Sequence, residues 1–519
     1  MKKKLIICAT IITIVLIYFF YNQNITNITY VTYKDKNENY ITEAVNLTKN
    51  QIINKYQNHD YLKIDTITTS KKITINQLSE LIDESKENAF EYGLSLLDGE
   101  ILLLCEEINS YKIIDYENYT IDYDNLNDLL ASKNITTTIT DITKLEIFET
   151  ESFYYENEEL IPLELVNGFH IRNIEYQKEN LETIIQGSAS LLQSMNKSTG
   201  EYVYGYRTNT GKKVSSYNIL RHAGSTWSLI LYYEKYPSEE LKETIENAID
   251  YLIENYTIKK DKNTILVVEQ KSDEIKLGGN ALTLLMLSDY YNVFNDDKYN
   301  DIATKIANGI IFMQEDDGSY NHVLNTDFSL KEEYRTVYYD GEATFALLKF
   351  YGISNDRQYY RAAKKAIDMF LEENYEKYRD HWISYSLNEF LKYNQNEKYI
   401  AFALRNYTYN VSRLDDNTTF GPVRVELLLT TYKSYHDIKE INPESESIKK
   451  FDLDQLEESI EINLEVLFSY FIDKETAIYF KDETKALYGF HDIDSNFRMR
   501  IDDIQHSLLG IMMYYDEIL

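Results

Sequence analysis

Two stretches of the chain repeat one pattern. Residues 278–307 read GGNALTLLMLSDYYNVFNDDKYNDIATKIA, and residues 340–367 read DGEATFALLKFYGISNDRQYYRAAKKAI. Each runs through a glycine, a polar residue, an alanine, an apolar helix, an Asn-Asp break and an alanine-rich second helix. Weaker copies begin at His222 and His381. The repeating unit is therefore a helical hairpin, which buries its first helix only against neighbouring hairpins.

The same pattern fills the C-terminal part of the chain. After Tyr176, apolar residues recur at helical spacing in twelve segments, and no strand pattern of any length interrupts them. The segments are 180–195, 218–235, 239–255, 277–294, 298–313, 341–351, 358–373, 382–393, 397–409, 423–436, 453–471 and 501–519. If the first segment pairs with the last, six hairpins close into a ring and no terminal cap is needed. An open solenoid is the alternative.

The N-terminal part has a different character. Three lysines precede the apolar run 5–21, which predicts a transmembrane signal anchor over residues 1–21 with the rest of the chain extracytoplasmic. A cleaved signal peptide is the rival interpretation. The polar residues 22–60 are expected to form a stalk. Mixed helix and strand patterns over 61–171 predict a small α+β domain of unknown role.

Composition excludes several classes of function. The chain of 519 residues has 85 acidic and 53 basic side chains, for a formal net charge of −32. Such a field repels phosphate backbones, so nucleic acid is not an expected partner. The only cysteines, Cys8 and Cys105, are too few for a disulfide scaffold or a thiolate zinc site. We expect no metal and no other cofactor.

Five motifs in the helical part resemble a known superfamily. They are NILRHAGS at 218–225, GGNA at 278–281, YYDGEA at 338–343, DHW at 380–382 and RIDDIQHS at 500–507. With the hairpin repeat, they make residues 176–519 similar to the α/α-toroids, the six-hairpin fold of many glycoside hydrolases and of glucuronyl C5-epimerase and N-acylglucosamine 2-epimerase domains. The resemblance selects no single family. It implies a mainly helical closed toroid, with sugars binding where the inner helices begin.

Seven residues near the starts of predicted inner helices are candidates for acid and base catalysis. They are Glu342, Asp502, His222, His381, His506, Asp340 and Glu426. A glycosidase needs two carboxylates about 5 to 10 Å apart, and histidine moves protons near pH 7. The carboxylates could equally be helix caps. The histidines could equally be packing residues, or metal ligands on separate hairpins.

Seven further residues at the same helix starts are candidates for substrate binding. They are Asn218, Arg221, Asn280, Trp382, Arg424, Arg500 and Gln505. Arginine would hold a carboxylate on a uronic acid, although a buried ion pair with a nearby carboxylate explains it as well. Trp382 could stack on a sugar ring.

These observations predict a membrane-anchored, extracytoplasmic enzyme that acts on a cell-surface or extracellular glycan by acid and base chemistry. Glycoside hydrolysis would use Glu342 with Asp502 or Glu426. Epimerisation would use the three candidate histidines. The alternative is a non-catalytic envelope protein that binds glycan or protein at the same helix starts.

Overall fold

A computed structural model describes residues 25, 27–37, 39–84, 89–411 and 421–519. The predicted membrane anchor at residues 1–21 lies outside this part of the chain. Within it, no helix is both long enough and apolar enough to cross a membrane. The chain divides into two compact units. The β-rich unit comprises Met1–Ile174, Asn209–Gly211 and Ile472–Leu487, and the helical unit comprises Glu175–Thr208, Lys212–Phe471 and Tyr488–Leu519.

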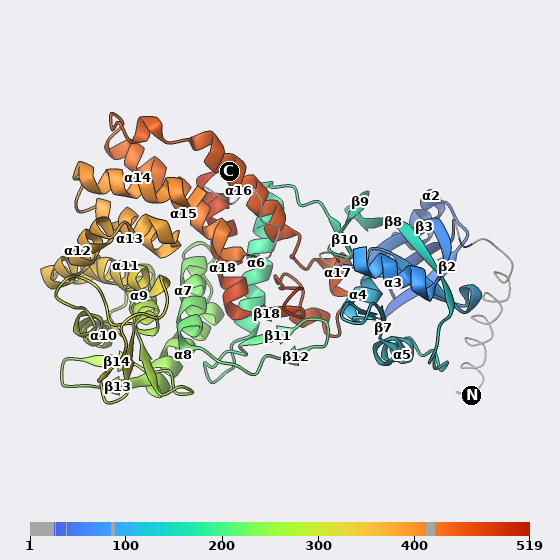
Figure 1. Cartoon of the computed structure of the whole chain (residues 1–519), viewed down its shortest axis with the longest axis horizontal. Coiled ribbons are helices and arrows are strands. Elements are labelled where there is room, and N and C mark those ends of the chain that lie inside the picture. The colour runs from blue at the N-terminus through green and yellow to red at the C-terminus, as the bar shows by residue number, and fades with distance from the viewer. Residues whose placement is uncertain (1–24, 26, 38, 85–88, 412–420) are drawn as a thin grey trace. The chain divides into compact units, whose positions relative to one another are not determined.

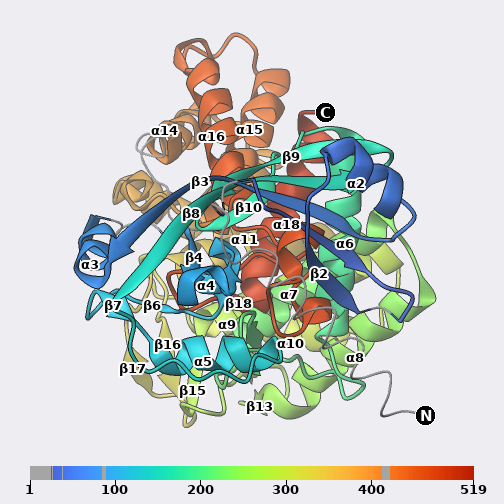
Figure 2. The ribbon, with the colours of Figure 1, turned by 90° about the vertical axis from the view of Figure 1, so that its right-hand side faces the viewer.

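The β-rich unit is built on an eight-stranded antiparallel sheet. Its strands are β1 (Thr29–Lys34), β2 (Tyr40–Val45), β3 (Leu62–Thr74), β4 (Gly93–Leu96), β5 (Ile101–Leu103), β8 (Lys144–Glu156), β9 (Glu159–Val166) and β10 (Phe169–Arg172). Figure 2 shows the long, twisted β3 and β8, which pair along most of their length. The unit also contains the helices α2 (Lys49–Tyr56), α3 (Ile75–Glu84), α4 (Cys105–Ser110), α5 (Tyr123–Ser132) and α17 (Lys474–Ala477), and the short pair β6 (Ile114–Asp115) and β7 (Thr120–Ile121).

The expected stalk at residues 22–60 is instead part of this sheet where the structure describes it. β1 lies between β2 and β3 and pairs with both, and it buries Val31 completely. The helix α2 begins with a capping box. The Thr48 side chain accepts a hydrogen bond from the backbone N–H of Gln51, and the Gln51 side chain accepts one from the backbone N–H of Thr48. The polar residues that suggested a stalk belong to strands with an exposed side. Composition alone therefore does not distinguish a stalk from such strands.

The helical unit is a ring of helical hairpins. Its inner helices are α7 (Ile219–Lys235), α9 (Leu277–Phe294), α11 (Tyr338–Ser354), α13 (His381–Leu391), α15 (Pro422–Ile441) and α18 (Ile501–Glu517). Its outer helices are α6 (Lys178–Ser194), α8 (Glu239–Tyr256), α10 (Asn300–Phe312), α12 (Arg357–Glu372), α14 (Glu397–Val411) and α16 (Leu453–Phe468). Each inner helix packs against the next, and α18 packs against both α7 and α6. In Figure 1 the red α18 lies beside the green α6 and α7, which closes the ring as the repeat predicts.

The inner helices are buried on nearly every side. In α9, every residue from Leu277 to Tyr290 is buried, because inner helices flank it within the ring and outer helices cover it. The Asn-Asp break of the repeat ends α9 and α11 in the same way. Asn295 and Asn355 cap them with φ values of 50° and 52°, the left-handed conformation that asparagine tolerates at a helix end.

The connections of the helical unit carry short strands that the sequence does not predict. They are β11 (Gly205–Arg207), β12 (Lys212–Lys213), β13 (Thr257–Lys259), β14 (Ile265–Val267), β15 (Glu274–Lys276), β16 (Val323–Asn325), β17 (Leu330–Glu332) and β18 (Arg498–Arg500). Two or three residues are too few to show an alternating pattern. The strands β15 and β18 run directly into α9 and α18, so their pairing fixes where those inner helices begin.

The segment Ile472–Leu487, which follows α16, belongs to the β-rich unit although it lies within the predicted toroid region 176–519. Several polar contacts hold it there, including the following two. The Tyr479 hydroxyl lies 3.0 Å from the buried Lys63 Nζ, and Arg172 forms a two-pronged ion pair with Glu475. Its partners are therefore distant in sequence, which explains why local pattern did not assign it.

Candidate active site

Three predicted catalytic residues converge on one spot. His381 is the first residue of α13, Glu426 lies near the start of α15, and His506 lies on α18. His506 Nδ1 donates to Glu426 Oε2 at 2.5 Å, and the rings of His381 and His506 are 5.8 Å apart between centroids. We refer to these residues as the His–Glu–His cluster. It forms because α15 packs between α13 and α18 in the ring.

The pKa values of the two histidines of this cluster are shifted in opposite directions. Burial lowers the pKa of His381 to about 4, so its ring is neutral. Burial acts in the same direction on His506, but the charge and hydrogen bond of Glu426 outweigh it and raise the pKa of His506. The neighbouring charges of Asp502 and Asp503 add to that effect. One cluster therefore combines a histidine whose neutral form is favoured with a histidine whose protonated form is favoured.

His381 is buried without a hydrogen bond. It is 3% exposed, neither ring nitrogen has a hydrogen-bond partner within the described residues, and Nδ1 lies 3.6 Å from Asp380 Oδ1. Buried polar atoms are nearly always paired, so such an exception points to a role beyond folding. Glu426, by contrast, is held from two sides, because Tyr385 donates a hydrogen bond of 2.9 Å to the carboxylate oxygen that His506 leaves free.

An arginine and carboxylate network lies beside His506. Asp502 Oδ2 accepts from Arg221 Nε at 2.7 Å and forms an ion pair with Arg500 at 2.9 Å. Arg500 also pairs with Asp503 at 3.1 Å. Burial and the charge of Asp502 raise the pKa of Asp503 to about 7. The arginines are thus matched by carboxylates, which is the ion-pair alternative that the sequence left open.

A second group of carboxyls lies at the starts of α11 and α13. Burial, together with the neighbouring Asp380 and Asp340, raises the pKa of Glu342 well above its usual value. Burial likewise raises the pKa of Asp380. Asp340 is held by His322 and by the Tyr375 hydroxyl, both at 3.2 Å. Sequence reasoning did not propose Asp380 for catalysis, because as the N-cap of α13 it is indistinguishable from an ordinary cap.

Three predicted site residues are structural instead. His222 faces the outer helix α8, with Nε2 2.9 Å from the Ala248 carbonyl and Nδ1 2.7 Å from the Tyr217 hydroxyl, so it packs rather than catalyses. The Asn280 side chain accepts a hydrogen bond from the backbone N–H of Val267 and donates to the backbone carbonyls of Val267 and Lys276. Asn218 caps α7 by accepting from two backbone N–H groups. The polar atoms of His222 and Asn280 are therefore used within the fold, as is Oδ1 of Asn218.

The other candidates take varied places. The Trp382 ring is 3% exposed and lies among Trp227, Phe345 and Tyr385, so it builds the wall rather than offering an open stacking face. Gln505 is buried against Gly224 of α7. Arg424 lies in the first turn of α15, two residues before Glu426.

Two groups of residues within the described chain have the spacing that a metal ion needs. The ligand atoms of the His–Glu–His cluster all lie within 4.8 Å of one another, as do those of Cys105, Glu106 and His170 in the β-rich unit. A cation at the first group would compete with the proton between His506 and Glu426. At the second group, the Lys63 ammonium lies 3.0 Å from Glu106 and already supplies the positive charge.

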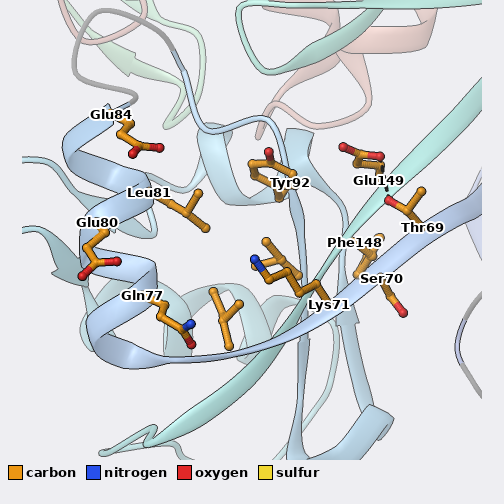
Figure 3. A pocket seen from close by; sticks show the side chains of 12 residues that line it. Thr69, Ser70, Lys71, Gln77, Glu80, Leu81, Glu84, Tyr92, Phe148 and Glu149 are labelled. Carbon is orange, nitrogen blue, oxygen red and sulfur yellow. Dashed lines mark hydrogen bonds between the residues drawn. The ribbon is translucent and has the colours of Figure 1, made fainter.

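The β-rich unit has a cavity of its own, with a volume of about 340 Å³. Figure 3 shows its lining, which comes from β3, α3 and β8 and includes a hydrogen bond between Thr69 and Glu149. Its charged side chains, such as Lys71 and Glu80, are exposed to solvent. None of the predicted site residues lines it.

Solved structures with the same fold are sugar-modifying enzymes. A sugar epimerase from a ruminal bacterium matches with a TM-score of 0.51 and 10% identity, over 65% of this chain and 99% of its own. Cellobiose 2-epimerase from Bacillus thermoamylovorans matches with a TM-score of 0.50 and 11% identity, over 66% and 100%. An α-mannanase from Bacteroides thetaiotaomicron matches with 0.46 and 12%, over 66% and 96%. No protein-family model and no curated protein matches the sequence. At these identities the likeness shows the fold alone, and it confirms the expected α/α-toroid.

Proposed function

We propose that this protein is a sugar epimerase or isomerase that moves a proton on the carbon beside the carbonyl group of an open-chain sugar. The observation that carries the proposal is the placement of His381 and His506 in one cluster, 5.8 Å apart between ring centroids, with pKa values shifted in opposite directions. Such a reaction needs a base and an acid that both reach one carbon. Sugar epimerases with the same fold are consistent with it.

Each residue of the cluster has a part in the proposed reaction. His381 takes the proton from C2, and the C–H electron pair moves into the C1–C2 bond to give an enediolate. His506 returns its proton to the opposite face of C2, which inverts that centre. Glu426 keeps His506 protonated until then. The two histidines end with exchanged protonation states, and exchange with water restores them.

Hydrolysis is the second candidate, and one observation favours it. A glycosidase needs one protonated and one ionised carboxyl. Glu342 has a raised pKa, while Asp502 forms ion pairs with two arginines. The His–Glu–His cluster has no part in that mechanism, so we rank hydrolysis below epimerisation. A non-catalytic binding protein would leave the opposite pKa shifts of the two histidines without a use.

The test is proton exchange at C2. Glucose, mannose and cellobiose would be incubated with the protein in D2O, and deuterium at C2 would be followed by NMR. We expect exchange with the wild-type chain and a loss of about 10²- to 10⁴-fold for His381→Gln and His506→Gln. His436→Gln is the matched control, because His436 is an exposed histidine of α15. Glu342→Gln separates the two candidate reactions. Epimerisation does not use Glu342, so this variant should keep the deuterium exchange at C2.

Two results would reject the proposal. One is the absence of exchange on all three sugars, and the other is exchange that survives in His381→Gln. Turnover of a glycan fragment that Glu342→Gln abolishes would instead favour hydrolysis.

We also propose that residues 1–21 anchor the enzyme in a membrane with the remaining chain outside the cytoplasm. The support is the apolar run after three lysines. Protease added to intact cells would remove the bulk of the chain if this orientation is correct, and would leave it whole if the chain faces the cytoplasm.

A further inference from the structure

Three tyrosines near the start of α11 and α13 have exposed side chains. Tyr334 is 53% exposed, Tyr338 is 43% exposed and Tyr378 is 39% exposed. Exposed aromatic area costs free energy, and a group of such side chains on one surface marks a binding site. All three belong to the segments that lead into or immediately surround the candidate site rather than to the outer helices.

These tyrosines are neighbours of the same buried group. The charge of Asp380 contributes to the raised pKa of both Tyr334 and Tyr338, and Tyr378 contributes to that of Tyr334. Tyr338 lies 5.9 Å from His381 between ring centroids. Tyr338 therefore borders the His–Glu–His cluster, and the charge of Asp380 acts on both Tyr334 and Tyr338.

A hydrogen-bonded network holds their backbone in place. His322, which is 1% exposed, accepts from the backbone N–H of Arg335 at 2.9 Å through Nδ1 and contacts Asp340 at 3.2 Å through Nε2. Tyr375 donates to the same Asp340 at 3.2 Å and packs its ring edge against Tyr378. Arg335 further pairs with Glu274 through two hydrogen bonds. The segment 334–338 is thus fixed before any ligand arrives, which lowers the entropy cost of binding.

We propose that Tyr334, Tyr338 and Tyr378 form a platform for a second sugar ring, so that the substrate is a neutral oligosaccharide rather than a monosaccharide. This inference rests on the proposed function, because it places the reacting sugar at His381 and the next sugar on the tyrosines. A tyrosine offers a flat apolar face and a hydroxyl at its edge, which suits a sugar ring with C–H bonds on one face and hydroxyls around its rim.

Charge selects a neutral ligand for this platform. The carboxyls of Asp340 and Asp380 act on Tyr334, those of Asp380 and Glu342 act on Tyr338, and the whole chain has a net charge of −32. This negative charge would repel a polyanion such as a polyuronate or a nucleic acid. The pKa values of Glu342 and Asp380 are raised already, and an anionic ligand would add to the cost of ionising these two carboxyls.

The test measures binding without turnover. Methyl glycosides have no free carbonyl group, so the proposed epimerisation cannot act on them. Methyl cellobioside and methyl α-1,6-mannobioside would be compared with methyl glucoside and methyl mannoside by calorimetry. We expect at least one disaccharide to bind about tenfold or more tightly than its own monosaccharide. The double variant Tyr334→Ala with Tyr338→Ala should bring that ratio close to one.

Two variants keep the result interpretable. Tyr334→Phe with Tyr338→Phe keeps both rings, so it should keep most of the ratio. Tyr409→Ala removes a tyrosine of similar exposure from the outer helix α14 and should change nothing. The platform is rejected if neither disaccharide binds more tightly than its monosaccharide, or if the ratio survives in the double alanine variant. Failure of the C2 exchange assay alone would reject the reaction and leave this binding result standing.

Discussion

At the scale of single residues, Glu426 decides the charge state of the candidate site. It is fully buried, yet its pKa is lowered because His506 and His381 face it and Tyr385 donates to it. In return its charge acts to raise the pKa of both histidines. The pH window in which His381 is neutral and His506 is protonated therefore depends strongly on Glu426.

Glu426→Gln should move this window to lower pH. The acid limb of the activity profile follows His381, with a pKa of about 4, and the alkaline limb follows the raised pKa of His506. Removing the negative charge lowers both pKa values, so both limbs of kcat/KM against pH should shift toward acid, with the larger effect on the alkaline limb. The remaining charges that face His506, on Asp502 and Asp503, would keep part of the elevation.

Glu440→Gln is the control for that profile, because Glu440 lies on the same helix but is exposed. It should leave both limbs in place. An alkaline limb that does not move in Glu426→Gln would show that His506 does not supply the acid.

The sequence predicted part of this site. Helix geometry explains which residues it located and which it misplaced. His381, Glu426 and His506 stand near the starts of inner helices, which the hairpin repeat located. His222 stands at such a start as well, but its side chain points to the outer helix α8. An inner helix is apolar on both faces, so periodicity does not tell which face points inward. The unpartnered nitrogens of His381 had no sequence signal at all.

At the scale of elements, the start of α9 shows how closely the inner helices approach. A Cβ atom on Gly278 would lie 2.3 Å from Glu342 Oε2 and 2.6 Å from carbons of both Leu220 and Tyr339. A Cβ atom on Gly279 would meet nothing closer than 3.6 Å. Close packing therefore explains the glycine at position 278 but not the glycine at position 279.

Replacing each glycine by alanine should give opposite results. Gly278→Ala forces α7, α9 and α11 apart and should destabilise the protein by about 1–3 kcal/mol. Gly279→Ala fits the available space and should be neutral, or stabilising by up to about 1 kcal/mol because alanine favours the helix. Urea denaturation of both variants and the wild type measures the difference. Equal stability of the two variants would contradict the close approach at Gly278.

At the scale of the whole chain, long-range contacts account for what the sequence did not predict. The hairpin count, the helix positions and the partner of the last helix followed from a repeat of local pattern. The place of β1 in the sheet depends on pairing with β3, some thirty residues away. The segment Ile472–Leu487 joins the β-rich unit through partners such as Lys63 and Arg172, several hundred residues away. Local periodicity has no information about either.

Ring closure leads to a prediction about how the helical unit opens. In an open solenoid the terminal hairpins have one neighbour and unfold first. Here α18 packs against both α7 and α6, and the Arg221–Asp502 ion pair links α7 to α18 at 2.7 Å. Every inner helix therefore has two inner neighbours. Hydrogen exchange followed by mass spectrometry should give central amides of α7 and α18 the same high protection as those of α9 and α11. If α6 and α18 instead exchanged far faster than α9, the seam between the last hairpin and the first would open on its own, and the unit would behave as a solenoid whose ends only touch.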